Sequence, residues 1–177
     1  MADNRLQQDM PMEYQAGPFD KVAFAIGVLL AGVGLYFVLA STDVLPLPGG
    51  PASVNGPMWL LTCAGLAFGF SGLAVIIRAV TGAKDANGEL PAETPGWAKL
   101  IYLMMGPLIV ASLAAIGTWI AFGPGERDIT MSAPFFEGPS TEWIGRGAFG
   151  FGAIVTWLAA ALMARSVFRK ILGREKL

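Results

Sequence analysis

The sequence predicts an all-α membrane protein, a bundle of four transmembrane helices with its N- and C-termini in the cytoplasm. Apolar residues make up 54% of the 177 residues and charged residues only 14%, whereas soluble domains carry about 25% charged residues. Four uncharged stretches reach the length of about 20 residues that crosses a hydrocarbon core. Basic residues gather on one set of helix ends, which predicts the orientation.

The chain divides into a polar segment, a membrane domain and a tail. Residues 1–21 contain no apolar run and lack the pattern of a cleaved signal peptide, so we expect a polar cytoplasmic N-terminal segment. Residues 22–168 form the four-helix transmembrane domain, and residues 169–177 form a basic cytoplasmic tail. The predicted helices cover residues 22–42, 58–78, 98–122 and 143–168.

Proline and glycine separate these helices. Pro46, Pro48 and Pro51 crowd the first connection and interrupt helical hydrogen bonding. The second and third connections are similar in composition, and Ser140 or Thr141 is expected to cap the fourth helix. The connections therefore predict four separate helices.

Lysine and arginine flank the predicted helices unequally. Basic flanks are retained in the cytoplasm, so the imbalance places the N-terminus, the second connection and the C-terminus inside. Only Arg127 and Arg146 fall on the other side. The residues on the cytoplasmic side are Arg5, Lys21, Arg78, Lys84, Lys99, Arg165, Arg169, Lys170, Arg174 and Lys176.

Small residues recur along the apolar segments. Lipid provides no hydrophobic drive between helices, so close packing depends on positions where backbones can approach. We interpret these positions as packing faces within the monomer, with an oligomer interface as the alternative. They are Ala23, Gly27 and Ala31, then the GxxxG pair Gly65 and Gly69, and in the fourth helix Ala148, Gly152, Thr156, Ala160 and Ala164.

Charged residues concentrate in the third connection, which the orientation places outside. Glu126, Arg127, Asp128 and Arg146 are the candidate contacts for a cation, substrate or partner at the outer face. The alternative is a set of solvated charges with an ion pair between Glu142 and Arg146, one helical turn apart. At the other end, the basic tail predicts contact with anionic lipid, although orienting the chain would alone explain its charges.

Several classes of chemistry are disfavoured. The chain has no histidine and one cysteine, Cys63, so an intrachain disulfide and a His-ligated metal site are excluded. The GRGAFG run at 145–150 opens a membrane segment and lacks the alternating strand–helix series of a nucleotide-binding fold. No ionisable residue is central in any predicted helix. We expect no catalytic activity, no cofactor, no metal and no nucleic acid.

Pro107 lies inside the third predicted helix and has no N–H for the carbonyl of Leu103. We interpret the expected kink as structural, with a transporter-type binding site as the alternative.

The segments WIAFGPGERDIT at 119–130 and GRGAFGFGAIVTWL at 145–158 resemble uncharacterised four-helix inner-membrane proteins of proteobacteria. The resemblance covers the last three helices, and it implies a multi-pass protein of a bacterial inner membrane without assigning any chemistry. The functional expectation is a noncatalytic accessory or envelope component. The alternative is a small transporter or channel subunit. Partners beyond the lipid bilayer would be another membrane protein or further copies of this chain.

Overall fold

The computed structural model of the chain describes residues 19–50, 56–83, 90–91, 93–124 and 141–173. This part is all-helical, without strands, and its helices are α1 Lys21–Ser41, α2 Trp59–Thr81, α3 Gly96–Phe122 and α4 Thr141–Ile171. All four are long and apolar enough to cross a membrane. The predicted all-α fold of four membrane-length helices is therefore confirmed, and the helix ends differ from the expected ones by at most three residues.

Local signals in the sequence set several of these ends. The carboxylate of Asp20 caps α1 by accepting hydrogen bonds from the N–H groups of Val22 and Ala23, each at 3.0 Å. Gly82 ends α2 in the left-handed conformation (φ 66°), which glycine adopts without steric cost. Pro95 precedes the first residue of α3 and Gly123 follows its last. Helix ends are therefore encoded locally.

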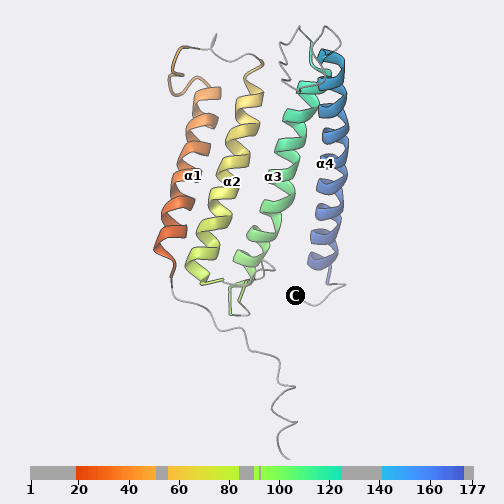
Figure 1. The fold of residues 1–177 in the computed structure, drawn as a ribbon. Helices are drawn as coiled ribbons and strands as arrows, with labels where there is room; N and C mark the ends of the chain where they lie inside the picture. Colours follow the sequence, from red (N-terminus) through yellow and green to blue (C-terminus); the bar gives the residue numbers. More distant parts are fainter. Residues whose placement is uncertain (1–18, 51–55, 84–89, 92, 125–140, 174–177) are drawn as a thin grey trace, which may run out of the picture.

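The four helices stand side by side in chain order, each antiparallel to the one before it (Figure 1). Contacts join α1 to α2, α2 to α3 and α3 to α4. Within the described residues α1 does not pack against α4, so the predicted bundle is an open single layer rather than a closed ring. Both broad faces of the layer are therefore left to lipid or to other proteins.

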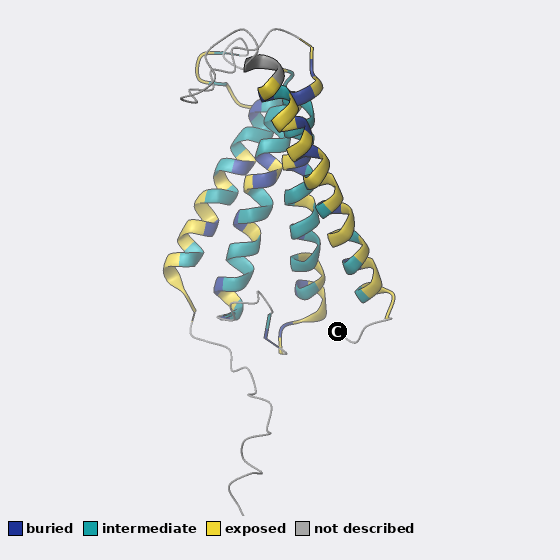
Figure 2. Cartoon of the chain, turned by 45° about the vertical axis from the view of Figure 1, so that its right-hand side comes forward, coloured by how far each residue is buried: buried dark blue, intermediate teal, exposed yellow. Residues whose placement is uncertain are grey.

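The distribution of side-chain sizes suits a lipid environment. The buried apolar positions are mostly alanines, whereas the exposed positions, which occur along all four helices (Figure 2), include many large apolar residues. Phe122, Phe151 and Leu158, for example, are 70%, 71% and 60% exposed. A soluble protein rarely exposes apolar surface on this scale. Small residues between helices and large ones outside are the arrangement expected in a bilayer.

Candidate functional site

The closest helix contact in the structure joins α1 to α2 through glycine. A Cβ atom added at Gly34 would lie 2.6 Å from the carbonyl oxygen of Gly65, and one added at Gly72 would lie 2.6 Å from that of Gly27. The reverse approaches, from Gly65 to Gly34 and from Gly27 to Gly72, are 2.7 Å and 2.9 Å. No side chain fits at these positions, so the two backbones touch directly.

The spacing of these glycines is seven residues, not the four of the predicted GxxxG pair. Gly65 occupies the contact as expected, but a Cβ atom at Gly69 would meet nothing within 4 Å, although the backbone of Gly69 lies against Gly34. Gly34 and Gly72 were not among the predicted packing residues. The signal for them was present in the sequence as glycines seven residues apart in each of two neighbouring helices.

Hydrogen bonds tie both ends of the α1–α2 pair. At one end the backbone N–H of Asp20 donates to the carbonyl of Ala79 at 3.4 Å. At the other end the hydroxyls of Ser41 and Thr62 lie 2.8 Å apart and share a hydrogen bond. This pair is thus fixed along its whole length and is a structural unit.

The α3–α4 contact uses small residues near one end of the helices. A Cβ atom at Gly117 would lie 3.5 Å from that of Ala153, and one at Gly150 would lie 3.5 Å from that of Ala121. Midway along α4, the indole N–H of Trp157 donates to the hydroxyl of Thr118 at 3.0 Å. The buried apolar residues of α4 are seven apart: Ala153, Ala160 and Val167.

The predicted stripe of α4 is mostly not part of this contact. Ala148 and Gly152 are exposed, a Cβ atom at Gly152 would meet nothing within 4 Å, and the hydroxyl of Thr156 donates to the Gly152 carbonyl of its own helix. Of the five predicted α4 positions, only Ala160 is buried. The prediction of tight intrachain packing along the stripe is therefore wrong for Gly152.

The stripe leaves the α3–α4 contact because of the angle by which successive residues turn around the helix axis. Each residue turns about 100°, so a step of four residues advances about 40° past a full turn, whereas a step of seven falls only about 20° short of two. A stripe of period four therefore curls away from a straight neighbouring helix. A series of period seven stays against it.

The uncovered stripe residues border an open groove. The groove has a volume of about 340 Å³. It is lined by Gly117 of α3 and, on α4, by Phe149, Ala153 and three residues of the stripe. The stripe residues are Ala148, Gly152 and Thr156. We call this hollow the small-residue groove.

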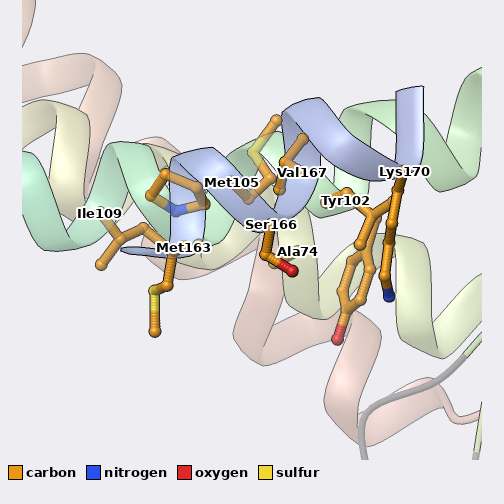
Figure 3. A pocket seen from close by; sticks show the side chains of 11 residues that line it. Ala74, Tyr102, Met105, Ile109, Met163, Ser166, Val167 and Lys170 are labelled. Atoms are coloured by element: carbon orange, nitrogen blue, oxygen red, sulfur yellow. The ribbon is translucent and has the colours of Figure 1, made fainter. Parts of the chain in front are cut away.

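A second hollow, of about 400 Å³, lies where α3 and α4 diverge, with α2 behind them (Figure 3). We call it the three-helix cavity. Tyr102 and Lys170 lie at one end of it, and Ile109 and Met163 lie toward the other. Pro107 also lines it, as does Leu103, the residue whose carbonyl the proline leaves without its helical donor.

Of the predicted outer contacts, Glu126, Arg127 and Asp128 lie outside the described residues. Arg146 is half-buried in the second turn of α4. No group of three or more potential metal ligands occurs in the described part of the chain. The structure thus places Arg146 at the end of α4 next to the third connection, away from the three-helix cavity.

Four membrane-length helices, with small residues between them and large apolar residues outward, define a multi-pass α-helical membrane protein. Comparisons with protein families, with curated proteins and with solved structures gave no match.

Proposed function

We propose that this chain is a noncatalytic accessory subunit of the envelope, in the cytoplasmic membrane of a bacterium, and that its small-residue groove receives a transmembrane helix of a partner membrane protein. The observation that carries the proposal is the groove itself. It presents Gly152 and Ala148 uncovered on the lipid-facing side of α4, where a second helix has direct access.

Small residues matter at such a surface because helices in lipid associate through close backbone approach. The intrachain contacts of α4 use Gly150, Ala153 and Ala160 instead, so occupation of the groove by a partner would not compete with the fold. The open layer also supports a partner helix at α4, because α1 and α4 do not contact each other within the described residues.

The charge distribution supports the orientation with both termini in the cytoplasm. Six of the seven described basic residues belong to the end of the layer where α1 begins and α4 finishes. They are Lys21, Arg78, Lys99, Arg165, Arg169 and Lys170, and Arg146 is at the opposite end. The resemblance at 119–130 and 145–158 supports a bacterial inner membrane. In this orientation the small-residue groove belongs to the outer half of the membrane.

A transporter or channel subunit is the second candidate. It is favoured by the three-helix cavity, because Pro107 interrupts the hydrogen bonding of α3 at the cavity wall. The accessory role is preferred because charged residues of the described helices all lie within about two turns of a helix end. Ion-coupled carriers place ionisable groups deeper in the membrane.

The test compares Gly152→Leu with Gly32→Leu. Both glycines are helical and meet nothing within 4 Å of an added Cβ atom, but Gly32 belongs to α1, far along the chain from the groove. Both variants should therefore keep the folded yield and melting temperature of the parent in detergent. Partners would be isolated from native membranes in mild detergent and identified by mass spectrometry.

We expect recovery of the principal partner to fall about tenfold or more with Gly152→Leu and to be unchanged with Gly32→Leu. Co-expression of two differently tagged copies shows whether that partner is a second copy of this chain. Unchanged recovery with Gly152→Leu, at normal folded yield, would remove the groove as the partner site.

A further inference from the structure

The three-helix cavity spans two depths of the membrane. Tyr102 and Ile109 on α3 are seven residues apart, as are Lys170 and Met163 on the antiparallel α4, which corresponds to about 10 Å along each helix. Lys170 is in the last turn of α4, at the level where helices meet lipid headgroups. Met163 and Ile109 are about 10 Å nearer the membrane centre.

The chemistry of the lining changes with depth. Two polar side chains occur at the helix ends, namely the ammonium of Lys170 and the hydroxyl of Tyr102. Ser166 and Met105 lie at an intermediate level, and the deepest residues, Ile109 and Met163, are apolar. A ligand that matches both regions has an anionic headgroup and a hydrocarbon chain.

We propose that the three-helix cavity binds one anionic phospholipid from the leaflet at the C-terminal end of α4. The phosphate binds the ammonium of Lys170 and the hydroxyl of Tyr102. One acyl chain runs inward between Met105 and Met163, whose flexible thioether side chains adapt to an irregular chain. The proposal is independent of the partner helix, since the small-residue groove lies in the opposite half of the α3–α4 pair.

A lipid bound in the three-helix cavity would compensate for the packing contacts that α3 and α4 lose where they diverge. The α3–α4 pair is closely packed at Gly117 and Gly150, and the start of α3 and the end of α4 diverge (Figure 2). An acyl chain in the opening restores the dispersion contacts that an empty cavity would lose. The lipid therefore acts as a wedge that completes the packing between α2, α3 and α4.

Native mass spectrometry of the full-length protein in detergent tests the proposal. The protein is titrated with phosphatidylglycerol and, separately, with phosphatidylcholine. We expect one phosphatidylglycerol per chain, bound about tenfold more tightly than phosphatidylcholine. Lys170→Gln should weaken phosphatidylglycerol binding about tenfold, because a charge-assisted hydrogen bond is lost. Arg169→Gln removes the same charge from the neighbouring, exposed residue and should have little effect.

A second pair of variants keeps every charge. Ala74→Phe fills the cavity from α2 and should abolish phosphatidylglycerol binding, whereas Leu73→Phe changes the adjacent residue outside the cavity and should not. Equal weakening by Lys170→Gln and Arg169→Gln would show diffuse surface attraction and overturn the site. Equal binding of the two lipids would overturn it too, as would a dimer of this chain that excludes lipid.

Discussion

Four missing methyl groups set the distance between α1 and α2. At Gly27, Gly34, Gly65 and Gly72 an added Cβ atom would lie within 3.0 Å of the opposite backbone, closer than real Cβ contacts occur. At each of the four positions the opposing atoms include a backbone carbonyl oxygen, which cannot rotate away as a side chain could. The close approach of α1 and α2 therefore requires glycine at each of these positions, and a substitution there should lower the free energy of unfolding.

Gly34→Ala should destabilise the protein by about 1 to 3 kcal/mol, the usual cost of overpacking a filled contact. Gly32→Ala is the matched control on the same helix, because a Cβ atom there meets nothing within 4 Å. Alanine is a better helix former than glycine by about 1 kcal/mol, so Gly32→Ala should leave stability unchanged or slightly raised.

The measurement is the free energy of unfolding in mixed micelles, with increasing sodium dodecyl sulfate. Equal stability of Gly34→Ala and Gly32→Ala would mean that α1 and α2 do not approach as closely as the glycine contacts require.

The sequence predicts part of this contact. It indicates packing at Gly27 and Gly65, because a small residue in a membrane helix favours close approach. Gly34 and Gly72 fall outside the predicted sets, because those sets follow a period of four residues. A single helix does not reveal which of its small residues face a neighbour, since that depends on how the second helix crosses it.

At the scale of the elements, one side-chain hydrogen bond joins the last two turns of α3 to the middle of α4. Trp157 lies near the middle of α4, away from the membrane boundaries where tryptophan is enriched. Its indole N–H donates to Thr118, 39 positions earlier in the chain. The hydroxyl of Thr118 in turn donates to the carbonyl of Ala114 at 2.7 Å. The position of Trp157 thus depends on Thr118, which belongs to a different helix, so the sequence around Trp157 alone does not explain it.

We expect Trp157→Phe and Thr118→Val to be coupled in a double-mutant cycle by about 0.6 kcal/mol and by no more than about 1.7 kcal/mol, the range of interhelical hydrogen bonds in membranes. Each variant removes the hydrogen bond and keeps most of the side-chain volume. The free energies of unfolding of the parent, both single variants and the double variant give the coupling energy. Trp97→Phe, at an exposed residue of α3, combined with Thr118→Val should give additive effects. Additivity between Trp157 and Thr118 would mean that the bond contributes nothing to stability.

The positions of the helices along the sequence were predictable, but the face of each helix that packs against a neighbour was not. Hydropathy and proline placement located α3 and α4 closely, because length and apolar content are properties of one segment. The stripe of Gly152 was assigned to the interior because small residues pack closely, whichever neighbour they meet. Ala153 and Ala160 are the residues that face α3, and only the crossing of the two helices distinguishes them from the stripe.

Across the whole molecule, each helix packs against its neighbours in the chain. Successive helices that each cross the membrane run antiparallel, and each contacts the next one in the chain, which gives the order from α1 to α4. The sequence could not predict whether α1 would close against α4. In lipid, the same outward apolar side chains suit an open layer, a closed ring or a partner protein.

The last prediction is the orientation of this layer in the membrane. The layer has two chemically different ends, with Lys21, Lys99 and Lys170 at one and Arg146 at the other. Because basic flanks resist translocation, the end with more lysine and arginine should be cytoplasmic. Single cysteines introduced in a Cys63→Ser background by Ser53→Cys or Ser132→Cys should react with impermeant thiol reagents added to intact cells. The cysteine of Asn87→Cys should react only after the membrane is permeabilised. The opposite pattern, with labelling at position 87 alone, would invert the proposed topology and move the three-helix cavity to the outer leaflet.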